Sequence, residues 1–266
     1  MSSSPEAIPP HIARALEKIV AWNEETDQQS PAVEAGSSLS GDDAKVPTLL
    51  VSSAAYQCFV QAVDHLHAVH ALLFTAEVLH PYAPYTLVRT AIENAATGIW
   101  ILSPASRPER VRRCLKRAWE NVRQGKEFMD RAGITPQPPA RSIVQREQEI
   151  KDLAVRNGLD QSDVCGRWST EHQIRCAGEA LGDSVAAQSF WRICSGFAHG
   201  HPWASLSMLE RAEHDREGNV VQLRLTGSSD ALLDLTYYAA AMTGKARALF
   251  EERRCAPFAE SGRGAS

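Results

Sequence analysis

An arginine, a serine and two histidines fall within ten residues of one another in the last third of the chain. The segment from Gln188 to Trp203 reads Gln-Ser-Phe-Trp-Arg-Ile-Cys-Ser-Gly-Phe-Ala-His-Gly-His-Pro-Trp. In a helix, Arg192, Ser195 and His199 lie three or four residues apart and share one stripe. A guanidinium presents a planar fork of donors to phosphate oxygens, and an imidazole exchanges protons near neutral pH. These three residues, the Arg192 stripe, are therefore our candidate site for phosphate chemistry.

The Arg192 stripe needs a helix that ends close to His199. The apolar spacing predicts a helix over residues 184–199. Gly200 then ends the helix, and Pro202 blocks its resumption. The partial negative charge at a helix C-terminus favours a positive group there. The other sides of this helix carry the apolar residues that would meet neighbouring helices, namely Phe190, Ile193, Cys194 and Phe197.

Two segments resemble a known superfamily. Trp191-Arg-Ile-Cys-Ser-Gly-Phe-Ala-His-Gly200 resembles the Arg-x(4–6)-His signature of HEPN domains. It is most similar to the aromatic-Arg…Ser…His-Gly run of an uncharacterised bacterial family grouped with them. Arg89-Thr-Ala-Ile-Glu93, ahead of Trp100, resembles the Arg…Glu helix of that family. The resemblance covers roughly residues 48–102 and 184–203.

This resemblance implies a metal-independent protein of defence or toxin type that cleaves or processes RNA. By family analogy, His199 moves a proton from the ribose 2′-hydroxyl or to the leaving 5′-oxygen, and Arg192 stabilises charge on the phosphate. HEPN sites form where two such helices meet, so the resemblance implies a homodimer, and a toxin would have an inhibitory protein partner. The further substrate-binding positions are Ser195, Arg89, Glu93 and His201.

The same residues have a second interpretation as a non-catalytic helical module that binds a nucleotide or a protein partner. Arg192 would then be a paired arginine of the bundle, and His199 would cap its helix. Arg89 and Glu93 stand at positions i and i+4, where opposite charges pair on a helix regardless of function.

A third interpretation, a metal-dependent bundle enzyme, rests on a histidine-rich run. Asp64-His-Leu-His-Ala-Val-His70 is followed by Glu77-Val-Leu-His80. Glu-x-x-His is half of the di-iron carboxylate signature, which needs a second copy and two further carboxylates on other helices. The sequence holds no second Glu-x-x-His. We therefore expect no metal and no other cofactor.

The bulk composition indicates an ordinary globular protein. The 266 residues are 44% hydrophobic and 23% charged. The net charge of −4 creates no overall attraction to nucleic acid. The N-terminus lacks a basic, apolar leader, and polar residues interrupt the apolar stretch 49–79, so we expect a cytoplasmic protein without membrane contact. The cysteines form no Cys-x-x-Cys pair and predict buried free thiols at positions 58, 114, 165, 176, 194 and 255.

Apolar periodicity predicts a mainly α fold, a HEPN-like helical bundle with extra helices and one small β-hairpin. Residues 1–47 would form a partly disordered acidic arm, with a mobile linker over 24–45. One bundle domain would span 48–254, with a hairpin at about 204–226, and 255–266 would be a loose tail. The expected helices cover about residues 11–22, 48–79, 85–102, 108–132, 141–157, 170–181, 184–199 and 230–253.

One predicted helix is strongly basic. Residues 107–131 carry nine Arg or Lys against four acids. This helix could contact a nucleic-acid backbone, with Trp119 stacking on bases, or it could be a solvated amphipathic face. Alternatively the arm at 1–45, with eight acids and three bases, could cover it.

Overall fold

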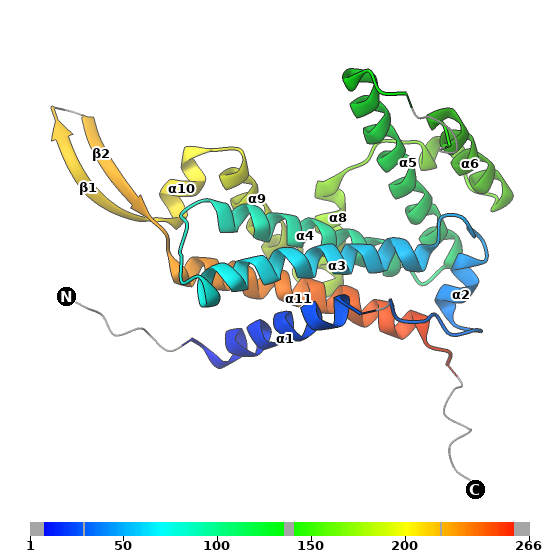
Figure 1. The fold of residues 1–266 in the computed structure, drawn as a ribbon, viewed down its shortest axis with the longest axis horizontal. Helices are drawn as coiled ribbons and strands as arrows, with labels where there is room; N and C mark the ends of the chain where they lie inside the picture. The colour runs from blue at the N-terminus through cyan, green and yellow to red at the C-terminus, as the bar shows by residue number, and fades with distance from the viewer. Residues whose placement is uncertain (1–7, 29, 136–140, 219, 258–266) are drawn as a thin grey trace, which may run out of the picture. The chain divides into compact units, whose positions relative to one another are not determined.

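A computed structural model gives the fold and describes residues 8–28, 30–135, 141–218 and 220–257. Within these residues the chain forms eleven α-helices, one π-helical turn and one two-stranded antiparallel sheet (Figure 1). The prediction of a mainly α protein with one β-hairpin is confirmed. Residues 1–7 of the predicted arm and 258–266 of the predicted tail lie outside the described residues. No helix within the described ranges is long and apolar enough to cross a membrane.

The helices follow the predicted order closely. In chain order the elements are α1 (Pro10–Thr26), α2 (Ser38–Asp43), α3 (Val51–His70), the π-helical turn η1 (Ala71–Thr75), α4 (Ala83–Leu102), α5 (Arg107–Ala132), α6 (Ile143–Arg156), α7 (Gln161–Val164), α8 (Thr170–Leu181), α9 (Ser184–Ala198), α10 (Pro202–Met208), β1 (Glu210–Glu217), β2 (Val220–Thr226) and α11 (Ser229–Arg254).

The chain divides into two compact units. Unit 1 comprises the described residues of Met1–Ser30, Cys58–Thr97 and Glu171–Arg247. Unit 2 comprises those of Pro31–Gln57, Gly98–Thr170 and Ala248–Ser266. Helices α3, α4 and α11 supply residues to both units.

In unit 1, α1 lies along α11 (Figure 1), and the rings of His11 and Tyr237 meet with centres 4.9 Å apart. Ile12, Leu16 and Ile19 recur at helical spacing and are buried. The glycine at position 244 of α11 gives the ring of Trp22 room, since a Cβ there would lie 3.3 Å from it. The first helix of the predicted arm is therefore part of the core of unit 1.

Unit 2 contains a buried ion pair between Asp42 of α2 and Arg110 of α5, in a region where the sequence predicted a linker. Ser37 caps α2 by accepting a hydrogen bond from the backbone amide of Ser40 at 3.1 Å. Leu39 and Asp42 of α2 are 0% exposed. The prediction of a mobile linker over 24–45 is wrong for α2. Its polar composition suggested exposure to solvent, but the carboxylate of Asp42 is buried and paired.

Helix α3 ends earlier than the proline at position 81 suggested. Its last turn widens into the π-helical η1, in which the amide of Ala76 donates to the carbonyl of Ala71 at 2.8 Å. Glu77 then adopts a left-handed backbone with φ of 53°, and a hydrogen bond of 2.9 Å from the amide of Val78 to Leu72 closes the turn. Backbone geometry, and not the proline, therefore stops this helix.

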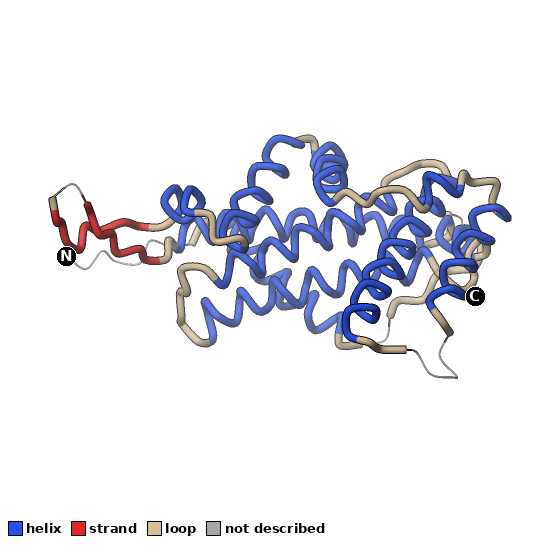
Figure 2. Tube along the Cα trace, turned by 90° about the horizontal axis from the view of Figure 1, so that it is seen from above, coloured by secondary structure: helices blue, strands red, loops and turns tan. Residues whose placement is uncertain are grey.

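The hairpin begins later than expected, at Glu210, because residues 202–208 are helical. Pro202 stands at the first turn of α10, where its fixed φ suits a helix, so it starts a helix and does not merely prevent one. The strands pair from Glu210 opposite Thr226 to Glu217 opposite Val220, with a bulge in β1 between Glu213 and Asp215. Both views show the hairpin projecting away from the helices of unit 1 (Figures 1 and 2).

Candidate functional site

Helix α9 presents the Arg192 stripe to solvent. The helix starts after Asp183, whose side chain accepts a hydrogen bond from the amide of Ala186 at 2.8 Å. Along the stripe, the side chain of Arg192 is 59% exposed, Ser195 is half-buried and His199 is exposed. Helical geometry places the first and last of these on one side, about 10 Å apart along the axis.

The guanidinium of Arg192 is held by a neighbouring helix. Its Nη2 donates to Oε1 of Glu171, in the first turn of α8, at 2.5 Å. Its Cζ also lies 5.9 Å from the ring centre of Trp191. Because both partners of the ion pair are more than half exposed, solvent screens the pair and a competing oxyanion can displace it.

His199 caps the C-terminus of α9. Its amide donates to the carbonyl of Ser195 at 3.0 Å, and Gly200 follows with φ of 67°, the left-handed conformation typical of a helix end. The chain then turns sharply, and the amide of His201 donates to the carbonyl of Gly196 at 2.8 Å. The rings of His199 and His201 lie 6.0 Å apart. The turn therefore gathers two exposed imidazoles at the end of the stripe.

The second motif meets α9 directly. Oε1 of Glu93 accepts hydrogen bonds from Nε of Arg89 at 2.9 Å and from the indole Nε1 of Trp191 at 2.8 Å. The side chains of Arg89 and Glu93 are 24% and 28% exposed. The pair thus ties α4 to α9 at Trp191, the residue next to Arg192.

The buried side of α9 carries a thiol that sequence reasoning assigned only to the core. Burial raises the pKa of Cys194 to about 12, so the thiol stays protonated and unreactive at neutral pH. Burial, and then the nearby Cys194, raise the pKa of Tyr85 to about 12. The ring of Tyr85 stacks on Phe197 with centres 3.8 Å apart. These contacts anchor the buried side of α9 and leave the Arg192 stripe at the surface.

Gly196 is the site-positioning residue that sequence reasoning missed. A Cβ at this position would lie 2.6 Å from Cβ of Ala204 and 2.9 Å from the ring of Trp203. Only a glycine therefore lets α10 approach α9 this closely, and this approach fixes the turn that holds His199 and His201. The nearest sequence signal was the small residue between Ser195 and Phe197, which alone does not reveal a close contact.

The histidines of the histidine-rich run contact residues close to them in the sequence. His65 forms a hydrogen bond of 2.7 Å with the carbonyl oxygen of Gln61. The rings of His67 and His70 stack 6.1 Å apart, and His70 also meets Phe74. Burial, and then the neighbouring His67, lower the pKa of His70. Among the described residues, no group of three or more His, Cys, Asp or Glu side chains is placed to hold a metal ion.

The basic face of α5 is largely neutralised within unit 2. Arg112 donates two hydrogen bonds to the carboxylate of Glu109. The carboxylate of Asp42 in α2 accepts hydrogen bonds from the guanidinium groups of Arg107 and Arg110. An acidic residue of the predicted arm therefore does contact this helix. The further ion pairs of its basic residues are Arg112–Asp163, Arg113–Glu109, Lys116–Asp163, Arg123–Glu120, Arg123–Glu127, Lys126–Asp130 and Arg131–Glu127.

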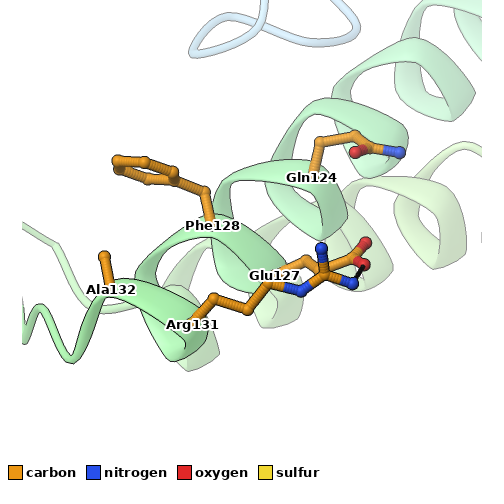
Figure 3. A pocket seen from close by; sticks show the side chains of 5 residues that line it. All are labelled: Gln124, Glu127, Phe128, Arg131 and Ala132. Carbon is orange, nitrogen blue, oxygen red and sulfur yellow. Dashed lines mark hydrogen bonds and ion pairs between the residues drawn. The ribbon is translucent and has the colours of Figure 1, made fainter.

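Two aromatic residues of α5 differ in their availability. The ammonium of Lys151 lies 5.4 Å from the ring centre of Trp119 and covers one face of the ring, where a nucleic-acid base would otherwise stack. Phe128 is 63% exposed and projects from α5 at a hollow lined by residues of this helix, which also carries the Glu127–Arg131 ion pair (Figure 3). Because one helix supplies the lining, the hollow is a shallow surface without converging groups.

Comparisons with known proteins add no family to this description. No protein-family model matches the chain, and neither do the curated proteins or the solved structures that were searched.

Proposed function

We propose that the protein cleaves or processes RNA without a metal ion, with Arg192 and His199 as the catalytic pair, in the manner of HEPN ribonucleases. One observation carries this proposal: both side chains leave the same stripe of α9 and are exposed to solvent. A guanidinium and an imidazole so placed are accessible to a phosphodiester, which a buried structural pair would not be.

The proposed chemistry follows from the two groups. His199 takes the proton of a ribose 2′-hydroxyl, the 2′-oxygen attacks phosphorus, and the 5′-oxygen leaves with a proton from water. Arg192 stabilises the negative charge that builds up on the phosphate oxygens. Glu171 occupies one N–H group of Arg192, so the guanidinium keeps further donors for the phosphate. The products carry 2′,3′-cyclic phosphate and 5′-hydroxyl ends.

Homodimerisation is part of the proposal because one helix separates the two groups by about 10 Å. If two copies of α9 pack antiparallel about a two-fold axis near Ser195, Arg192 of one copy faces His199 of the other. The indole of Trp203, 52% exposed beside Gly196, would be covered in such a pair. Each dimer then holds two composite sites.

The first experiment tests catalysis by the full chain on a single-stranded RNA oligonucleotide in excess chelator. Cleavage to cyclic phosphate ends is expected, with loss of at least about 100-fold in His199→Ala and Arg192→Ala. A 2′-deoxy oligonucleotide should stay intact. Arg175→Ala is the matched control, because Arg175 is another exposed arginine of unit 1 paired to a glutamate.

The second experiment mixes the two inactive variants. Composite sites predict that mixed dimers of Arg192→Ala and His199→Ala regain one intact site, so the mixture recovers part of the wild-type rate. No recovery would place both groups of a site on one copy. If the wild type binds RNA but never cleaves it, and both variants bind equally well, the catalytic proposal fails and a non-catalytic binding module remains.

A further inference from the structure

Unit 1 holds a cavity of about 560 Å³ that the proposed RNA chemistry does not use. Its floor is one face of α11, where Asp234, Leu235 and Tyr238 recur at helical spacing. Phe190 of α9 lines one side, and His11 of α1 lines another. Leu235 is 1% exposed, whereas Asp234 is exposed, so the cavity runs from an apolar floor to a charged mouth. This volume lies in the range of sites for small organic ligands.

Aromatic rings form the walls of this cavity. Phe190 meets Tyr238 edge to face with ring centres 4.7 Å apart, and His11 meets Tyr237 in the same way at 4.9 Å. The hydroxyl of Tyr238 donates to the carbonyl of Asp183 at 3.4 Å. The hydroxyl of Tyr238 is therefore already hydrogen-bonded to the protein. Its ring contributes apolar aromatic surface to the cavity wall.

Among the described residues that line this cavity, Asp234 is the one carboxylate, and none is a lysine or an arginine. Among the described residues, no lysine or arginine forms an ion pair with Asp234. Its carboxylate thus stands unneutralised beside three aromatic side chains. Carboxylate and ring faces both attract a cation, and both disfavour an anion.

From this arrangement we infer that unit 1 binds a small organic cation, an amine or quaternary ammonium with an apolar or aromatic body. The ammonium group lies near Asp234 and the ring of Tyr237, and the apolar body lies over Leu235 between Phe190 and Tyr238. The site is separate from the Arg192 stripe, so it stands whether or not the protein cleaves RNA.

Calorimetric titration of the full chain with benzyltrimethylammonium tests this inference, with phenylacetate as an anion of similar size. Saturable binding is expected for the cation and none for the anion. Asp234→Asn should weaken the cation about fivefold, the worth of one solvent-screened ion pair. Phe190→Leu should also weaken it, because it removes one aromatic wall. Asp230→Asn is the matched control, since it removes the same charge one turn away and outside the cavity lining.

The outcomes separate cleanly. No saturable heat with benzyltrimethylammonium overturns the inference, as does equal binding of phenylacetate. If Asp230→Asn weakens the cation as much as Asp234→Asn does, general surface charge explains the binding and the site is rejected. Because Asp234 is exposed, its variant should keep the wild-type melting temperature, which circular dichroism checks.

Discussion

The indole Nε1 of Trp191 donates a 2.8 Å hydrogen bond to Oε1 of Glu93, a residue 98 positions earlier in the chain. The same oxygen accepts from Nε of Arg89 at 2.9 Å. Two separate sequence motifs thus meet at one carboxylate oxygen. The consequence is mechanical: the residue next to Arg192 is fixed to α4, which sets the rotation of α9 about its own axis.

The first prediction concerns this hydrogen bond. Trp191→Phe keeps a ring but removes the N–H donor, and it should lower the free energy of unfolding by about 1 kcal/mol, since Glu93 is charged but partly exposed. Urea denaturation measures the loss. In the Glu93→Gln background the same change should cost less, because the acceptor is no longer charged. Equal costs in both backgrounds would mean that the charge of Glu93 does not strengthen this hydrogen bond.

The second prediction concerns the close approach of α9 and α10. Gly196→Ala forces a Cβ to within 2.6 Å of Ala204 and should destabilise the protein by about 1–3 kcal/mol, the usual cost of overpacking. Gly125→Ala is the control: a Cβ on this helical glycine would meet no atom within 4 Å, so alanine should stabilise by up to about 1 kcal/mol. Thermal melts of both variants measure the opposite signs, and a stabilised Gly196→Ala would contradict the packing.

Sequence periodicity predicted the long helices because each has a continuous apolar face. Leu115 and Val122 of α5, for example, repeat at helical spacing and are buried. The short helix α10 escaped prediction because it spans under two turns, and Pro202 is compatible with either a break or a start. The π-helical turn η1 also escaped, since its side chains carry no distinguishing pattern.

The candidate site could be predicted only along one helix. Helical spacing predicted Arg192 and His199 on one stripe, and both side chains are exposed. Their partners could not be predicted, because Glu171 belongs to another helix and only the packing of α8 against α9 brings it to the guanidinium. The role of Gly196 was hidden for the same reason: a close approach depends on the partner helix.

The third prediction concerns the buried ion pair of unit 2. Asp42 is 0% exposed and accepts from Nε of Arg110 at 2.6 Å and from its Nη2 at 2.8 Å. Asp42→Asn leaves a guanidinium that is 3% exposed without its counter-charge, so unfolding should become easier by about 3–5 kcal/mol. Chemical denaturation measures this.

The matched control for that pair is Arg107→Ala. The Arg107 side chain is 45% exposed and its Nε meets the same carboxylate at 3.1 Å, so its removal should cost no more than about 1 kcal/mol. Comparable losses in the two variants would show that burial does not govern the strength of this cluster.

The fourth prediction is a pH dependence at Glu109. Hydrogen bonds from Arg112, and secondly from Arg113, lower the pKa of Glu109 from 4.5 to about 2, although partial burial opposes the shift. A carboxyl whose pKa is lower in the folded state stabilises the fold above its unfolded pKa and loses that contribution as the pH falls through the folded value. The stabilisation should therefore be complete above about pH 4.5 and disappear toward pH 2.

Glu109→Gln measures the contribution directly. At pH 7 the variant should unfold more easily by about 1–3 kcal/mol, because the carboxylate accepts charge-assisted hydrogen bonds from two guanidinium groups. The difference from wild type should shrink as the pH is lowered from 4.5 toward 2, since the wild-type carboxyl then becomes neutral as well. Glu213→Gln is the control, since that carboxyl and its partner Arg216 are well exposed on the hairpin and its loss should leave unfolding unchanged. A difference between Glu109→Gln and wild type that stays constant down to pH 2 would mean that the lost stability comes from shape or polarity and not from charge.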